Sequence, residues 1–286
     1  MKRRATSIAL AVLMTLPLLA GETGHLVIIG GGKRPMAMMR EIVTLGGGAD
    51  SRFLVIPMAS SAPLDVALYQ QYQLDKAGAG SVDFAIFSPE SADHDTTLAR
   101  LDGVTGIFFS GGDQRRLAAH LAGTRFLERL HELYRDGAVI AGTSAGAAVM
   151  SRVMITGDEV GLAEDAEPFQ RIAAETVVTD TGFAFIEGAI IDQHFIRRKR
   201  HNRLISLVLE RPELLGIGID EATAIVVAPD GTFRVSGENT VLVIDAADAA
   251  DIGTDARGNL GAAGMTMHLL REGDRFDMRK RAVVEP

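Results

Sequence analysis

Residues 138–150 read AVIAGTSAGAAVM, and this stretch decides the fold. Its apolar part, Ala138–Ala141, predicts a buried strand, and the small residues after Ser144 predict a helix that begins at once. The segment Gly142–Gly146 fits G-x-S-x-G, a sharp turn that exposes a serine hydroxyl where a strand ends. The N–H groups at the start of the next helix favour negative charge. Ser144 is therefore a candidate nucleophile and the N–H of Ala145 a candidate oxyanion donor; the alternative is a glycine-rich turn with an unreactive serine.

Short apolar runs alternate with amphipathic stretches on both sides of this turn. The apolar runs predict strands at His25–Ile29, Phe53–Pro57, Val82–Phe87, Gly106–Phe109, Ala138–Ala141 and Ala189–Ile191. The amphipathic stretches predict helices at Met36–Thr44, Leu64–Lys76, Gln114–Leu121 and Arg125–Arg135. This alternation is typical of an α/β fold in which helices cover both faces of a parallel sheet.

The last third of the chain has a different pattern, in which strands are separated by turn signals such as Pro229-Asp230-Gly231. The expected strands are Ala224–Ala228, Thr232–Val235, Thr240–Asp245 and Met265–Leu270. They predict a β-rich C-terminal extension built from hairpins. Because no repeat or long linker interrupts the sequence, we expect residues 21–286 to form a single domain.

Two further glycine turns follow predicted strands. In the parallel sheet, the turn after Gly106–Phe109 lies at the same edge as Ser144, where ligands bind. There the N–H of Gly112 could approach a developing oxyanion, and Gln114 could orient a substrate. The run Gly30-Gly31-Gly32-Lys33 fits neither the dinucleotide fingerprint nor the phosphate-binding loop. We therefore interpret it as a turn with a structural role.

A serine nucleophile needs a base, and His194 is the favoured candidate because it follows the apolar strand Ala189–Ile191 at a carboxyl edge. The base in turn needs an acid that holds its tautomer. Glu221 follows another short apolar run with flanking glycines, and Asp158 and Glu159 are alternatives closer to Ser144 in the chain. Five other histidines are poorer candidates: His25 at the expected mature N-terminus, His94 in a charged loop, and His120, His131 and His268 in helix or late-strand patterns typical of structural or solvated residues.

A basic run, Arg197-Arg198-Lys199-Arg200-His201-Asn202-Arg203, follows the candidate base directly. Cations in the first turn of a helix oppose its dipole, and at helical spacing Arg197 and Arg200 continue the apolar face of Leu204 and Leu207. Local rules broken in this way tend to mark functional sites. We therefore expect an anion-binding pocket beside His194; the alternative is a solvated basic patch.

The composition excludes several classes of function. The chain has 286 residues with 29 Lys and Arg, 37 Asp and Glu, a formal net charge of −8, and no cysteine. The lack of cysteine excludes thiol nucleophiles, disulfides and cysteine-based metal sites. Net negative charge disfavours nucleic acid and anionic membranes as partners. The cations Lys2, Arg3 and Arg4 followed by an apolar stretch are typical of a signal peptide at residues 1–20, which predicts a secreted or periplasmic protein. Its removal would take the net charge to −11. The alternatives are an uncleaved anchor or a misassigned start codon.

Together these motifs resemble those of peptidase family S51, a family of serine peptidases. The resemblance covers most of residues 25–228 and rests on Gly111–Gln114, Gly142–Ala147, Ile191–Phe195 with the arginines that follow, and Gly218–Glu221. It implies a three-layer α/β/α, flavodoxin-like fold related to the class I glutamine amidotransferases. It also implies a catalytic triad of Ser144, His194 and Glu221, with Glu159 as the alternative acid.

The resemblance further implies a pocket and a substrate. The implied substrate-binding residues are Gln114, Asp192, Gln193, Arg198, Arg200 and Arg203. The family branch that this chain resembles degrades cyanophycin, a poly-aspartate with arginine on each β-carboxyl, to β-Asp-Arg dipeptides outside the cell. The resemblance implies a homodimer and neither a metal ion nor an organic cofactor. Two other functions stay open on sequence alone: an aspartyl or isoaspartyl dipeptidase of the same family, and a non-catalytic protein that binds anionic peptides.

Overall fold

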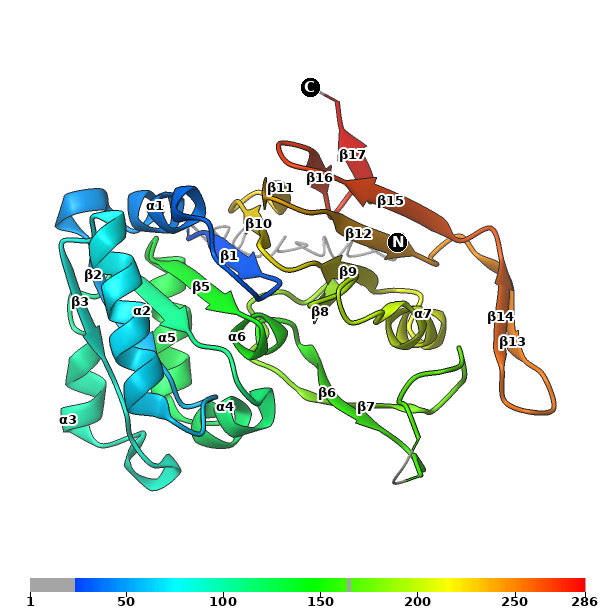
Figure 1. Ribbon diagram of the computed structural model, residues 1–286, viewed down its shortest axis with the longest axis horizontal. Coiled ribbons are helices and arrows are strands. Elements are labelled where there is room, and N and C mark those ends of the chain that lie inside the picture. Colours follow the sequence, from blue (N-terminus) through cyan, green and yellow to red (C-terminus); the bar gives the residue numbers. More distant parts are fainter. Residues whose placement is uncertain (1–23, 164–165, 286) are drawn as a thin grey trace, which may run out of the picture.

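A nine-stranded sheet forms the centre of the computed structural model, which describes residues 24–163 and 166–285 (Figure 1). In spatial order its strands are β17 (Ala282–Val284), β16 (Arg275–Asp277), β11 (Thr232–Gly237), β10 (Thr223–Val227), β1 (Leu26–Ile29), β5 (Val139–Thr143), β4 (Gly106–Phe109), β2 (Arg52–Ile56) and β3 (Ser81–Phe84). From β1 to β3 every pairing is parallel, whereas β10, β11, β16 and β17 add antiparallel hairpins. The predicted signal peptide, Met1–Ala20, lies outside the described residues.

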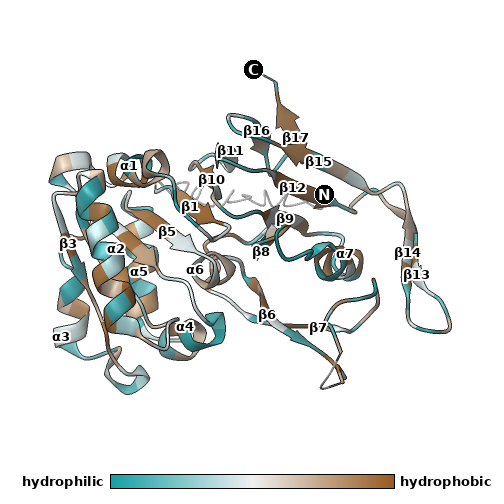
Figure 2. Cartoon of the chain, in the orientation of Figure 1, coloured by the Kyte–Doolittle hydropathy of each residue, from teal (hydrophilic) through white to brown (hydrophobic). Residues whose placement is uncertain are grey.

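Helices cover both faces of the parallel strands. They are α1 (Met36–Leu45), α2 (Pro63–Ala77), α3 (Asp95–Leu98), α4 (Gln114–Leu121), α5 (Arg125–Arg135) and α6 (Ala145–Ala148), with short 3₁₀ turns at Gly48–Asp50, Pro89–Ser91 and Ala99–Leu101. Because strand side chains alternate, Val27 and Ile29 pack with α1, whereas Leu26 and Ile28 join the core beneath α4, α5 and α6. Figure 2 shows this arrangement as apolar strands between helices whose outer faces are polar. The predicted three-layer α/β fold is confirmed.

A second, four-stranded sheet carries the candidate base and was not expected as a separate sheet. Its order is β15 (Thr266–Leu270), β12 (Val241–Asp245), β9 (Leu215–Ile219) and β8 (Ala189–Gln193), and only β8 and β9 pair in parallel. The sequence pattern placed Ala189–Ile191 in the parallel sheet, but β8 is paired with β9 instead. Ile191 and Ile217 pack into the core of the main sheet, while α7 (His201–Glu210) covers the opposite face through Leu204.

The basic run lies mostly before a helix and not inside one. Residues 195–200 form a turn and α7 begins at His201, so the expected helical continuation of Arg197 and Arg200 with Leu204 and Leu207 is wrong. The turn is held because the backbone N–H of Arg197 donates to Asp220 Oδ1 at 2.9 Å. Arg200 is the N-cap residue of α7 and Arg203 lies in its first turn, so these two cations still lie at the positive end of the helix dipole.

Two hairpins project from this layered core: β6 (Val153–Glu159) with β7 (Val177–Thr181), and β13 (Ala250–Thr254) with β14 (Leu260–Ala263). Both lie at the end of the molecule that carries α7 (Figure 1). The second hairpin is exposed along both strands except at Leu260, which is half-buried. Within residues 24–163 and 166–285, no helix combines the length and apolarity needed to cross a bilayer.

Candidate active site

Ser144 occupies a strained turn between β5 and α6. Its backbone has φ 55° and ψ −111°, a region that ordinary residues rarely adopt. Such a conformation costs about 1–3 kcal/mol and tends to occur at functional sites. The flanking glycines make the turn possible: a Cβ on Gly142 would lie 2.3 Å from the Gly146 carbonyl oxygen, and one on Gly146 would lie 2.4 Å from the Phe109 oxygen. The spacing of the glycines is therefore a steric requirement of this turn.

Ser144, His194 and Glu221 form a continuous hydrogen-bonded chain. Ser144 Oγ lies 2.8 Å from His194 Nε2, and His194 Nδ1 lies 2.6 Å from Glu221 Oε1. An ionised carboxylate can only accept, so Nδ1 carries the proton and Nε2 accepts from the serine hydroxyl. This arrangement has the geometry of a nucleophile, a general base and an orienting acid.

Residues at the end of β1 link the two sheets beside the hydrogen-bonded chain of Ser144, His194 and Glu221. The backbone N–H of Ser144 donates to the Ile29 carbonyl at 3.0 Å, and that of His194 donates to the Gly30 carbonyl at 2.7 Å. Strands β5 and β8 lie in different sheets, yet the residues that directly follow them bond to Ile29, the last residue of β1, and to Gly30, which comes next. The distance between nucleophile and base is therefore set by backbone hydrogen bonds and not by flexible side chains alone.

The protonation states suit a base paired with an acid. Burial lowers the pKa of His194 below its ordinary 6.5, although the hydrogen bond to Glu221 acts in the opposite direction. The hydrogen bond from His194 lowers the pKa of Glu221. Both shifts favour a neutral imidazole beside a carboxylate at neutral pH. A neutral imidazole is the form that can take the serine proton.

The glycine run after β1 packs directly against the histidine and the acid. A Cβ on Gly31, whose φ is +103°, would lie 2.4 Å from His194 Cε1, and one on Gly32 would lie 2.8 Å from Glu221 Cβ. The run was interpreted as a structural turn, and it has in addition the role of making room for the imidazole. Its position directly after β1, at the edge that carries Ser144, was the available signal.

The other two candidate acids lie elsewhere. Asp158 pairs with Arg115 at 2.8 Å on the surface. Glu159, at the end of β6, accepts a hydrogen bond from the backbone N–H of Phe169. Of the three candidates, Glu221 is the acid in contact with His194.

One expected oxyanion donor was the N–H of Gly112, but the glycine nearest to Ser144 is Gly111. A Cβ on Gly111 would lie 3.4 Å from Ser144 Cβ, whereas one on Gly112 would collide with the Ala59 carbonyl oxygen. Gly112 has φ +144° and lies tightly against the loop after β2. The N–H groups of Gly112 and Ala145 have no acceptor among the residues that the structure describes.

Asp192 and Arg203, two of the expected substrate-binding residues, pair with each other. Arg203 Nε donates to Asp192 Oδ2 at 2.7 Å, and a second guanidinium nitrogen of Arg203 donates to Oδ1. Asp192 is 1% exposed and Arg203 is 3% exposed. In this buried pair the carboxylate and the guanidinium form hydrogen bonds with each other. The two residues therefore stabilise the site and do not present free charges to a substrate.

Arg200 lies above this pair and is partly exposed. Its guanidinium donates to the backbone oxygen and to Oε1 of Gln193, at 2.7 and 2.8 Å, and lies 3.6 Å from Asp192 Oδ1. Burial, together with the neighbouring positive charge of Arg203, lowers the pKa of Arg200 to about 10, which leaves it protonated at neutral pH. Gln193 therefore orients Arg200, while Arg198 is exposed.

Gln114, another expected substrate-binding residue, makes hydrogen bonds within the protein through its amide nitrogen. Its amide nitrogen donates to the backbone oxygens of Ile155, at 2.8 Å, and Thr156. These bonds hold the start of α4 against β6. Most of the predicted substrate-binding residues thus form hydrogen bonds within the protein, and Arg198 and Arg200 are the two arginines of the set that could contact a substrate.

Ser144 and His194 open into a cleft of about 280 Å³. Its walls come from the glycine run after β1, from α2 and from the turns after β4 and β5; they include three residues that the sequence did not single out, namely Arg34, Gln70 and Thr143. Residues 24–163 and 166–285 contain no group of three or more His, Asp or Glu side chains that could hold a metal ion.

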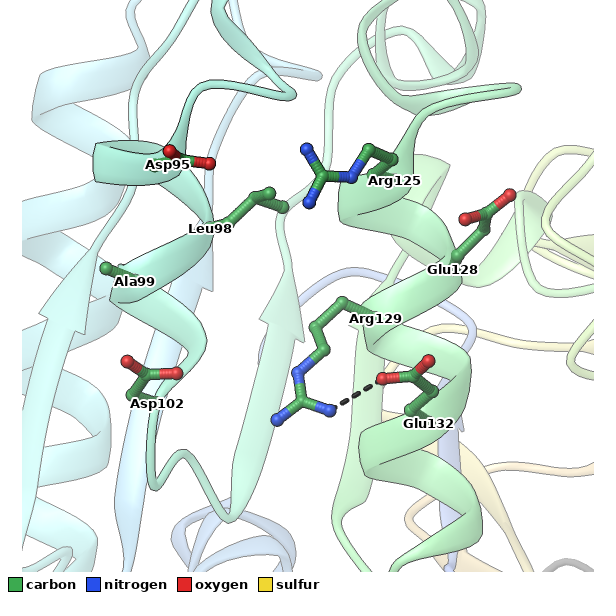
Figure 3. Close-up of a pocket in the computed structure, with 8 residues that line it drawn as sticks. All are labelled: Asp95, Leu98, Ala99, Asp102, Arg125, Glu128, Arg129 and Glu132. Carbon is green, nitrogen blue, oxygen red and sulfur yellow. Dashed lines mark hydrogen bonds and ion pairs between the residues drawn. The ribbon is translucent and has the colours of Figure 1, made fainter.

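A larger cavity of about 400 Å³ lies away from this site, between α3 and α5 (Figure 3). Its charged side chains include Arg129, which pairs with Glu132 at 2.6 Å across the helix surface. Its lining residues include no serine, threonine or histidine and none of the residues around Ser144. The nucleophile, base and acid therefore identify the smaller cleft as the candidate active site.

Comparison with known proteins places this geometry in a family. The sequence model of peptidase family S51 matches residues 26–235. The chain is 35% identical to a cyanophycinase from Synechococcus elongatus, covering 92% of this chain and 82% of that protein. It is 34% identical to a cyanophycinase from Trichormus variabilis, covering 93% and 89% of the two chains.

Solved structures agree with this at the level of the fold. A peptidase from an acI-B1 actinobacterium superposes with a TM-score of 0.66 at 23% identity, covering 92% of this chain and all of that one. A putative peptidase E from Listeria monocytogenes superposes with a TM-score of 0.51 at 16% identity, covering 76% of this chain and all of that one. The family match and the two relatives lead to one conclusion: the chain is a serine peptidase and belongs to peptidase family S51.

Proposed function

We propose that the protein hydrolyses cyanophycin through Ser144, His194 and Glu221. The observation that carries the proposal is the hydrogen-bonded chain at 2.8 and 2.6 Å, which ends at a cleft. The substrate is suggested by two relatives that are cyanophycinases, because the sequence similarity to each of them extends over most of both chains. The released product would be the β-Asp-Arg dipeptide.

The reaction begins when Ser144 Oγ attacks a backbone carbonyl carbon of the substrate and His194 Nε2 takes the hydroxyl proton. The negative charge moves to the carbonyl oxygen, where the N–H groups of Gly112 and Ala145 can donate to it. When the C–N bond breaks, the leaving amine takes the proton from His194. Water then attacks the acyl ester by the same route, which releases a carboxylate and restores the serine.

Glu221 and Arg200 have different roles in this scheme. Glu221 accepts from Nδ1 and stabilises the imidazolium that forms in each step. Arg200 and the exposed Arg198 can bind the carboxylates of the arginine side groups, since a guanidinium pairs with a carboxylate through two parallel hydrogen bonds. Asp192 attracts Arg200 at 3.6 Å and is itself held in place by its pair with Arg203.

The test compares Ser144→Ala with Ser61→Ala, a control at an exposed serine on the loop before α2. Both variants are purified and incubated with insoluble cyanophycin, and soluble dipeptide is measured by mass spectrometry. We expect the control to match the wild type and Ser144→Ala to lose digestion at an unchanged melting temperature. More than a few per cent residual activity in Ser144→Ala would contradict the mechanism.

The same assay separates the alternative functions. An aspartyl dipeptidase would cleave a soluble α-linked Asp dipeptide and leave the polymer intact. A non-catalytic binding protein would retain the polymer without releasing product, and a serine-reactive phosphonate would not label Ser144. Either result would reject cyanophycin hydrolysis.

Export and assembly are part of the proposal. We propose that residues 1–20 direct the protein out of the cytoplasm and that the mature protein is a homodimer. The mass of the protein recovered from the culture medium or periplasm tests the first statement, since an intact N-terminus would contradict cleavage. Light scattering of the purified protein tests the second, and a mass of one chain would contradict it.

A further inference from the structure

Three of the residues that line the cleft beside Ser144 each carry one buried polar atom without a hydrogen-bond partner. These atoms are Arg34 Nε, Gln70 Nε2 and Thr143 Oγ1; the only other such atom in the described residues is His268 Nε2. Gln70 is 2% exposed and Thr143 is 4% exposed. Buried polar groups are nearly always hydrogen-bonded, so a cluster of unpaired ones needs an explanation.

These atoms come from three separate parts of the fold. Arg34 lies on the loop between β1 and α1, Gln70 lies on α2, and Thr143 ends β5 immediately before the nucleophile. All three can donate a hydrogen bond. The lining residues of the cleft include no aspartate or glutamate that could accept from them.

Aromatic rings hold the Arg34 guanidinium in place. Its central carbon lies 5.5 Å from the centroid of the Tyr69 ring and 5.9 Å from that of Phe108. Ring contacts occupy the faces of a guanidinium and leave its N–H edge available for a planar acceptor. Among the described residues, no carboxylate forms an ion pair with Arg34. Burial lowers the pKa of Arg34, and a bound anion would oppose that shift.

We propose that Arg34, Gln70 and Thr143 form a subsite that binds a carboxylate of the substrate next to Ser144. A carboxylate is planar, carries negative charge and accepts several hydrogen bonds at once, which matches a fixed guanidinium edge with a neighbouring amide and hydroxyl. This subsite is separate from the basic run, because neither Arg198 nor Arg200 lines the cleft. The inference rests on the proposed function, since it assigns a part of the substrate to a part of that site.

The substrate offers two carboxylates of this kind. One is the α-carboxylate of the arginine attached to each aspartate side chain. The other is the C-terminal carboxylate of the aspartate backbone. Three synthetic oligomers distinguish them: the native β-Asp-Arg trimer, the same trimer with agmatine in place of arginine, and the native trimer with a C-terminal amide. Agmatine keeps the guanidinium and lacks the carboxylate.

The key variant is Arg34→Gln, and its matched control is Arg40→Gln, an exposed arginine on α1. For Arg34→Gln on the native trimer we expect KM to rise by about 10- to 100-fold, because the lost interaction is a charged hydrogen bond. We expect kcat to change by less than about threefold, since uniform substrate binding is removed. Arg40→Gln should leave both constants unchanged.

The substrate lacking the recognised carboxylate should bind the wild type as weakly as the native trimer binds Arg34→Gln. For that substrate, Arg34→Gln should cause no further rise in KM. A match with the agmatine trimer assigns the arginine carboxylate, and a match with the amide assigns the C-terminal one. An unchanged KM for Arg34→Gln on the native trimer would overturn the proposal, as would an equal loss on all three substrates.

A second variant, Thr143→Val, separates binding from folding. It replaces an unpaired buried hydroxyl with a methyl group of similar shape, so we expect an unchanged or higher melting temperature together with a raised KM. A lower melting temperature with an unchanged KM would overturn the subsite. Labelling of Ser144 by a neutral phosphonate should proceed at the wild-type rate in both variants. Failure of the proposed function is distinguishable, because the wild type and Arg40→Gln would then also fail to cleave the trimer.

Discussion

Replacing Asp192 with asparagine should destabilise the protein strongly. Asp192 is 1% exposed and is the counter-ion of Arg203, itself 3% exposed. The amide is close in shape to the carboxylate, so the change removes a charge and little volume. It leaves two neighbouring guanidinium groups, Arg203 and the mostly buried Arg200, without a buried negative charge.

The expected loss can be estimated from this geometry. Breaking a buried ion pair by removing one partner costs about 3–5 kcal/mol. For a chain of this size each kcal/mol lowers the melting temperature by about 2–4 °C, so we expect a decrease of about 6–20 °C. The pKa of Arg200, already lowered to about 10 by burial and by Arg203, should fall further once Asp192 no longer opposes that shift.

The measurement is urea unfolding at pH 7, with Asp158→Asn as the matched control. Asp158 also pairs with an arginine, Arg115, at 2.8 Å, but the two side chains are 52% and 53% exposed. Exposed pairs contribute about 0–1 kcal/mol, so the control should unfold close to the wild type. If Asp192→Asn unfolds within about 1 kcal/mol of the control and only its KM rises, then Asp192 contacts the substrate and the buried-pair argument is wrong.

Two further predictions concern the base. Because burial lowers the pKa of His194 below 6.5, kcat/KM should rise with pH through a midpoint below 6.5 and level off near neutrality; a midpoint above 6.5 in the pH profile would refute this. Gly31→Ala should lower kcat by about 100-fold or more, because the new Cβ would lie 2.4 Å from His194 Cε1 and displace the general base. Gly78→Ala is its control, with φ +97° and no atom within 4 Å of the new Cβ, and should show similar backbone strain with unchanged kcat.

The active-site turn illustrates what local sequence can predict. The strand–turn–helix at Gly142–Gly146 was recognisable because every contact that shapes it lies within a few residues or in a neighbouring strand. The position of His194 after β8 was predictable for the same reason, since an apolar run followed by polar residues marks the end of a strand. The pairing of β8 with β9 was not predictable, because strand runs of similar hydrophobicity do not reveal their partners.

The acid shows where sequence reasoning stopped. Glu221, Asp158 and Glu159 all follow or end apolar runs, and all are plausible by spacing. Only the folded chain brings one of them to 2.6 Å from His194 Nδ1. The other two form surface or loop contacts, which depend on where the β6–β7 hairpin projects.

By itself, the sequence determined the α/β class, the turn at the candidate nucleophile, the candidate base and the basic run beside it, because periodicity and short motifs act over a few residues. The tertiary structure decided the second sheet, which candidate acid contacts His194, and the pairing of Asp192 with Arg203. It also brought Arg34, Gln70 and Thr143 to one cleft from three elements far apart in the chain. Contacts of that kind depend on how strands pair and helices pack, and no local pattern of residues encodes them.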